Sequence, residues 1–237
     1  RTQQPNVDIS KVSLTDDATF AMLREGKTCG VFQIESAGMT DLTKKMKAAD
    51  MESLSALIAL YRPGPMEWIP SYVARRLGQE ETTYPHPLLK DTLEVTFGIA
   101  VYQEQVMQMA RVLAGYTLAG ADLLRRAMGK KKPEEMAKER VKFVEGAKAV
   151  NNIEADEANR IFDQMSAFAG YGFNKAHSMA YALISYQTAY LKCHFPLEFM
   201  AAVMTYDRGN VEKLHRYKVE IEKLGFTLLP VDVNHSQ

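Results

Sequence analysis

The chain has 237 residues, and its 29 lysines and arginines balance its 29 aspartates and glutamates, so the formal net charge is zero. Hydrophobic residues make up 46% of the sequence, which predicts a packed core and excludes a disordered protein. No apolar run reaches the roughly 18 residues of a membrane-spanning helix, so we expect no membrane partner.

The two cysteines, Cys29 and Cys193, lie far apart in the sequence. Such sparse use of cysteine indicates a reducing compartment, and the lack of CxxC and HxxxH spacings argues against a Cys/His zinc site. The chain begins with Arg1 and has no secretory signal. We therefore expect an internal part of a longer, cytoplasmic protein.

Apolar residues three and four positions apart dominate the sequence and predict a mainly α fold with many helices. Thr15 is the expected N-cap of an early helix with Asp16 and Asp17 in its first turn. Gly129 is expected to end another helix in the left-handed conformation, and Pro133 to open the next. The later helical stripes cover residues 54–61, 106–113, 118–128, a segment from 133, 158–165, 176–190 and 214–224.

Strand signals are few and short. Residues 29–34 and 98–102 are the candidate strands, so the expected fold class is mainly α with a few short strands. Residues 226–233 look extended, although Pro230 places them at the edge of a sheet or outside one. A break rich in proline at 84–87 is the best candidate for a subdomain seam.

A dense run of positive charge lies in the middle of this neutral chain. Its cations are Arg125, Arg126, Lys130, Lys131 and Lys132, and no acidic residue occurs between Asp122 and Glu134. Such a cluster suits a phosphate or another polyanion. A solvated helix face explains most charge runs equally well, so spacing alone leaves both interpretations open.

A second segment lacks acidic residues altogether, because none occurs between Asp163 and Glu198. Asn174 is a good helix cap in the middle of this segment, after two glycines. Free backbone N–H groups at the helix start would then bind an anion together with nearby polar side chains, namely Lys175, His177 and Ser178. The alternative is a glycine hinge between two core helices, with His177 buried and hydrogen-bonded.

Arg62 follows a predicted helix and precedes Pro63-Gly64-Pro65. Taken alone, it is an exposed arginine at a helix stop. No phosphate-binding Walker loop, GxSxG elbow or HExxH motif is present. The chain thus has residues that can bind anions but no recognisable catalytic centre, and we assign it no catalytic or metal-binding residue.

Six segments in order resemble the bacterial DNA polymerase III alpha subunit family, the C family of replicative DNA polymerases. They are GVFQIES (30–36), LYRPGP (60–65), FGIAVYQEQVM (97–107), GADLLRRAMGKKK (120–132), FAGYGFNKAHS (168–178) and PLEFMAAVM (196–204). The resemblance covers nearly the whole chain and implies that residues 1–237 form a helical fingers region.

The resemblance also implies roles for individual residues. Arg125 and Arg126 match the arginines that bind the triphosphate in this family. A second nucleotide-facing segment matches Asn174, Lys175, His177 and Ser178. Lys130, Lys131, Lys132 and Arg62 are expected to contact phosphates of the nucleotide or of primer–template DNA.

The aspartates that bind Mg²⁺ in this family lie in the palm, and no matching Lys-Phe-Asp motif occurs here. We therefore expect the palm, the metallohydrolase-like domain and the clamp-binding region to be absent, and the isolated fragment to bind no metal and to be inactive. The parent enzyme would be a magnesium-dependent DNA polymerase that contacts other holoenzyme subunits. Two alternatives stay open, a non-enzymatic helical nucleic-acid-binding module and the fingers of an error-prone paralogue.

Overall fold

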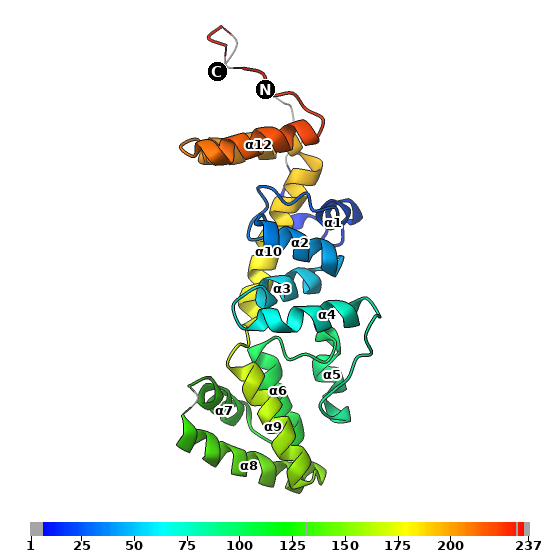
Figure 1. Ribbon diagram of the computed structural model, residues 1–237, viewed down its shortest axis with the longest axis vertical. Helices are drawn as coiled ribbons and strands as arrows, with labels where there is room; N and C mark the ends of the chain where they lie inside the picture. The colour runs from blue at the N-terminus through cyan, green and yellow to red at the C-terminus, as the bar shows by residue number, and fades with distance from the viewer. Residues whose placement is uncertain (1–6, 131, 231, 235–237) are drawn as a thin grey trace. The chain divides into compact units, whose positions relative to one another are not determined.

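The computed structural model describes residues 7–130, 132–230 and 232–234. Within these ranges the chain forms twelve α-helices and four short 3-10 helices without a β-strand. Figure 1 shows the helices along the chain. The prediction of a mainly α fold is therefore confirmed. The α-helices are α1 (Asp17–Arg24), α2 (Ala37–Met46), α3 (Met51–Leu60), α4 (Ile69–Arg76), α5 (Lys90–Leu93), α6 (Gln103–Ala114), α7 (Leu118–Lys130), α8 (Pro133–Asn151), α9 (Ala155–Ala169), α10 (Lys175–His194), α11 (Pro196–Tyr206) and α12 (Val211–Lys223). The 3-10 helices are η1 (Ile9–Lys11), η2 (Pro65–Trp68), η3 (Pro87–Leu89) and η4 (Glu94–Thr96).

The chain divides into two compact units. The first combines Arg1–Met51 with Ala182–Gln237, and the second is Glu52–Tyr181. Helix α10 begins in the second unit and ends in the first. The predicted seam at 84–87 lies within the second unit and stays a prediction.

The short strands expected over 29–34 and 98–102 do not form. In the first segment, Val31 N donates to Thr28 O and Ile34 N donates to Val31 O. Each of these bonds joins residues three positions apart, so this backbone forms turns. In the second, the amides of residues 101 and 102 both donate to the Gln105 side chain, at 2.9 and 3.0 Å. These local partners take the hydrogen bonds that a neighbouring strand would need.

The chain from 226 to 230 likewise has no strand, and of the described residues only Tyr102 and Phe173 form a bridge of β type.

Two helix ends differ from the sequence predictions. Asp16, not Thr15, is the N-cap of α1, since its Oδ2 accepts a hydrogen bond from Thr19 N at 2.8 Å. Gly129 stays helical, and α7 continues to Lys130. The stop is imposed by Pro133, because a residue before proline avoids the helical region and Lys132 is extended, with φ −77° and ψ 119°.

The second unit is built around α6, which packs against α7, α8 and α9. Val106, Met109, Phe143 and Phe162 are fully buried there, and the rings of Phe143 and Phe162 lie 5.6 Å apart. These interlocking apolar side chains make the rigid base from which the ends of α7 and α9 project.

Helices α6 and α8 approach so closely at Gly146 that a side chain has no room. A methyl group added there would lie 2.5 Å from the carbonyl oxygen of Ala114. We expect Gly146→Ala to lower the free energy of unfolding by about 1–3 kcal/mol, although alanine has a better helix propensity than glycine. The reason is that the backbone of α6 or α8 must shift to make room for the methyl group. Urea denaturation measures this. Gly209→Ala is the control, with no atom within 4 Å of the new methyl group, and a loss as large as that of Gly146→Ala would contradict the packing explanation.

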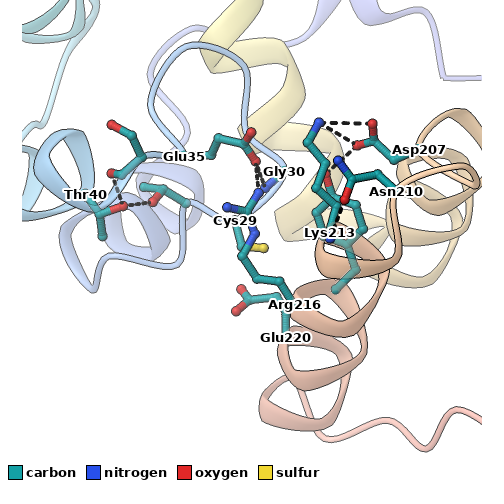
Figure 2. A network of polar contacts seen from close by, with 12 residues as sticks. Cys29, Gly30, Glu35, Thr40, Asp207, Asn210, Lys213, Arg216 and Glu220 are labelled. Atoms are coloured by element: carbon teal, nitrogen blue, oxygen red, sulfur yellow. Dashed lines mark hydrogen bonds and ion pairs between the residues drawn. The ribbon is translucent and has the colours of Figure 1, made fainter.

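In the first unit, ion pairs hold the loop before α2 against α12, as Figure 2 shows. Glu35 accepts hydrogen bonds from Gly30 N at 3.2 Å and from Arg216 at 2.8 Å. Nearby, the ammonium group of Lys192 is fully buried and donates to Glu220 at 2.6 Å and to the carbonyl oxygens of residues 27 and 29 at 2.9 and 2.8 Å. This loop carries the GVFQIES segment, so polar contacts rather than a strand fix its shape.

Candidate functional site

The arginine pair lies on α7 and shares one carboxylate. Arg125 donates to Asp122 Oδ1 from Nε and Nη2, at 3.1 and 2.9 Å, and Arg126 Nη2 lies 2.8 Å from Asp122 Oδ2. Hydrogen bonds from Arg125, followed by the charges of both arginines, lower the pKa of the Asp122 carboxyl. Two guanidinium groups therefore converge on a single anion at the surface of the second unit.

The two arginines differ in exposure, which separates what each can do. The Arg125 side chain is 20% exposed and Arg126 is 62% exposed, while Asp122 lies between them at 30%. Arg125 is thus the more rigidly held group, and Arg126 can swing outward. Asp122 precedes Arg125 by three positions and Arg126 by four. Helical spacing alone therefore indicates this pairing.

Of the lysines that follow, Lys130 and Lys132 are exposed. Lys130 ends α7, Lys131 lies outside the described residues, and Lys132 pairs with Glu135 at 3.2 Å with its side chain 62% exposed. An exposed pair of this kind contributes little to stability, so Lys132 can exchange its partner at small cost. Their phosphate contacts stay a prediction.

The start of α10 is capped as expected but is already occupied by a carboxylate. Asn174 Oδ1 accepts a hydrogen bond from His177 N at 2.8 Å. Glu104, in the first turn of α6, accepts from Lys175 N at 3.0 and 3.2 Å and from Asn174 Nδ2 at 2.9 Å. The expectation of free N–H groups at this helix start is therefore wrong for Lys175 and His177, because Glu104, 71 positions before Lys175, accepts the first N–H and Asn174 accepts the second.

A second distant acid reaches the same helix. Lys175 Nζ lies 3.2 Å from Glu52 Oε1 on α3 and 5.4 Å from the centre of the Tyr102 ring. The other carboxylate oxygen, Glu52 Oε2, is buried without a hydrogen-bond partner in the part of the chain that the structure describes. The segment that lacks acids in sequence thus meets two carboxylates in space.

Ser178 and His177 have different surroundings. Ser178 is fully buried, and its hydroxyl lies 2.8 Å from that of Ser55, which in turn lies 3.0 Å from Tyr102 Oη. Burial raises the pKa of Tyr102 to about 12. The Ser178 hydroxyl is therefore part of a buried polar group in this conformation. The His177 ring is exposed and stacks on Tyr181, with centroids 4.3 Å apart, so the alternative of a buried histidine is wrong.

Arg62 is more than an exposed residue at a helix stop. Its guanidinium donates to Tyr171 O at 2.7 Å and to Ala59 O at 2.9 Å, and lies 4.3 Å from the centre of the Phe173 ring. Burial lowers the pKa of Arg62. The turn packs closely on the same loop, since a methyl group added at Gly64 would lie 2.4 Å from the Tyr171 ring. Arg62 therefore holds the glycine-containing loop that leads to α10.

The two predicted anion-binding segments meet in the second unit. The last turn of α7 lies against the end of α9, where a methyl group added at Gly129 would be 4.0 Å from Ala169 O. Helix α9 leads directly into the loop at 170–174, and Figure 1 shows α7 beside α9. The fold thus gathers α7, the loop and the start of α10 at one end of the α6 bundle.

Sequence reasoning missed the three carboxylates of this region. Asp122 was recognisable from its helical spacing to the arginines. Glu104 and Glu52 were not, because only packing brings α3 and α6 to the start of α10. All three engage cations or N–H donors, so they do not fit the open carboxylate set that Mg²⁺ requires.

Among the described residues, one group of three metal-ligating side chains occurs, and it lies in the first unit. No helix in the described ranges is long and apolar enough to cross a membrane.

Comparisons with known proteins agree with the six matching segments. The family model of the bacterial DNA polymerase III alpha subunit finger domain matches residues 1–151. DNA polymerase III subunit alpha of Escherichia coli (strain K12) is 53% identical over 238 residues, which covers 98% of this chain and 20% of that protein.

Two further relatives carry the same name. The Haemophilus influenzae protein is 52% identical over 241 residues, covering 99% of this chain and 21% of its own length. The Thermus aquaticus protein is 51% identical over 235 residues, covering 97% and 19%. This chain spans about a fifth of the length of these curated relatives. With the family model matching more than half of its residues, the chain belongs to the finger-domain family of the bacterial DNA polymerase III alpha subunit.

Proposed function

We propose that this chain binds the incoming deoxynucleoside triphosphate and the primer–template DNA within a cytoplasmic DNA polymerase. The observation that carries this proposal is the convergence of two guanidinium groups on the Asp122 carboxylate. A planar guanidinium binds a carboxylate and a phosphate with the same fork of donors. The carboxylate therefore occupies the place that a phosphate oxygen takes when the nucleotide arrives.

The contribution of the arginines is electrostatic. In the proposed reaction the primer 3′-hydroxyl attacks the α-phosphate and pyrophosphate leaves. Arg125 and Arg126 bind the β- and γ-phosphates, hold them in line and stabilise the charge that develops on the leaving pyrophosphate. The partly buried Arg125 supplies the fixed charge, and the exposed Arg126 closes on the triphosphate.

The start of α10 forms the other wall of the proposed nucleotide site. Asn174, Lys175 and the exposed ring of His177 face the nucleotide there, and Arg62 holds the preceding loop in place. Ser178 supports the helix start from beneath through its bond to Ser55. Lys130 and Lys132 contact phosphates without reading sequence.

The activity of the whole polymerase is part of the same proposal. Magnesium would have to be bound by carboxylates outside this chain, since Asp122, Glu104 and Glu52 already engage cations or N–H donors. The chain alone is then inactive in primer extension, and its contacts with other polymerase subunits run through the longer protein.

Competition between Asp122 and the triphosphate gives a direct test. In the full-length subunit, Asp122→Asn removes the internal anion but keeps its shape. We expect the nucleotide KM to fall by about two- to fivefold, which is the effect of removing a surface carboxylate that pairs with both arginines. Primer-extension kinetics at varied nucleotide concentration measures this, and Asp91→Asn on α5 is the control.

Two outcomes would contradict the proposal. An unchanged or higher nucleotide KM in Asp122→Asn would show that the carboxylate does not compete with the substrate. A change confined to salt-dependent DNA affinity, with no response to nucleotide, would instead favour a nucleic-acid-binding module.

A further inference from the structure

Three metal-ligating side chains from distant parts of the sequence converge in the first unit. Asp16 is the N-cap of α1. Cys193 and His194 are the last two residues of α10. One ligand atom from each lies within 4.8 Å of the other two. Asp16 Oδ2 and His194 Nε2 are only 2.9 Å apart.

Surrounding contacts hold two of these donors in place. Asp16 Oδ2 accepts hydrogen bonds from the backbone N and the hydroxyl of Thr19, at 2.8 and 2.6 Å. The Asp16 amide donates to Tyr186 Oη at 3.1 Å, and the His194 ring packs on Tyr190 with centroids 4.4 Å apart. Such outer contacts orient ligands before a metal arrives, so binding requires little rearrangement.

The donor set selects a class of metal. A thiolate, an imidazole and a carboxylate suit Zn²⁺, whereas Mg²⁺ and Ca²⁺ prefer oxygen ligands alone. Metal–ligand distances of about 2.0–2.3 Å place the ligand atoms of a tetrahedral zinc site about 3–4 Å apart. The observed spacing of the three donors is compatible with that geometry after small side-chain movements.

We propose that Asp16, Cys193 and His194 bind one zinc ion, with water as the fourth ligand. The ion takes a position between Asp16 Oδ2 and His194 Nε2, which now contact each other at 2.9 Å. It joins the start of α1 to the end of α10, so its binding stabilises the first unit in proportion to the logarithm of zinc concentration. The absence of CxxC and HxxxH spacings does not exclude this site, because Asp16 lies 177 positions before Cys193 (193 − 16).

The test compares the two cysteines of the chain, which both belong to the first unit. The full-length protein is titrated with Zn²⁺ against a chromophoric chelator, as wild type, Cys193→Ser, His194→Gln and Cys29→Ser. We expect Cys193→Ser and His194→Gln each to bind one zinc ion fewer per chain than wild type. Cys29→Ser should bind the same number as wild type. Circular dichroism confirms that each variant is folded.

Alkylation provides a second readout that needs no variant. Peptide mapping after treatment with iodoacetamide should show that Zn²⁺ slows modification of Cys193 at least about tenfold, while Cys29 reacts at an unchanged rate and Mg²⁺ protects neither. Equal zinc stoichiometry in wild type and Cys193→Ser would overturn the proposal. Equal alkylation of Cys193 with and without zinc would overturn it as well.

Discussion

Replacing Arg125 with alanine in the full-length polymerase subunit is expected to lower kcat/KM for nucleotide incorporation about 10²–10³-fold. Arg125 is the less exposed of the two arginines, at 20%, so the packing around its side chain restricts its movement when the triphosphate replaces Asp122 as its partner. A charge held in place stabilises the developing pyrophosphate without the cost of reorganisation. Single-turnover primer extension measures the loss, and DNA affinity should change by no more than about twofold.

A matched control separates this role from a general loss of positive charge. Arg111 is exposed on α6 of the same unit and donates to Gln108 at 2.9 Å. Arg111→Ala removes the same charge and should leave kcat/KM within about twofold of wild type. If Arg125→Ala matched this control, or if it weakened DNA binding as strongly as it slowed incorporation, Arg125 would not bind the triphosphate.

Lys192→Met is expected to lower the free energy of unfolding by about 3–5 kcal/mol, the usual cost of removing one partner from a buried ion pair. The Lys192 side chain is 0% exposed and that of its partner Glu220 is 12% exposed. Methionine fills the volume but leaves the Glu220 carboxylate and two carbonyl oxygens without their donor. Denaturant unfolding followed by circular dichroism measures the loss.

The comparison for Lys192 is an exposed pair of the same chemistry. Lys213 lies 3.0 Å from Asp207, with the two side chains 39% and 28% exposed, and Figure 2 shows both. Lys213→Met should cost less than about 1 kcal/mol. Similar losses for the two variants would mean that burial does not set the strength of the Lys192 pair.

Local sequence was sufficient for several helix ends, where the deciding residue lies within about one helical turn. Pro133 opens α8 and Asn174 caps α10, both as the spacing predicts. The strand predictions failed although the deciding partners are also local. The expected strands at 29–34 and 98–102 have the right composition, but turns and the Gln105 side chain take up their backbone hydrogen bonds.

The candidate nucleotide site could be located from sequence, but not its electrostatic state. The basic run and the segment without acids identify α7 and the start of α10. The expectation of unneutralised charge there failed because Glu104 and Glu52 come from α6 and α3. A count of charges along the chain cannot detect acids that packing brings from more than 70 positions away.

The sequence by itself determined the helical fold class, several helix ends and the family, because these depend on apolar period, capping residues and long ordered motifs. Only the tertiary structure decided which charges distant in sequence meet. It paired Lys192 with Glu220, Lys175 with Glu52, and Asp16 with His194. The physical reason is that hydrogen bonds within a helix join neighbours in sequence, whereas the contacts of a buried or converging polar group are set by how whole helices pack.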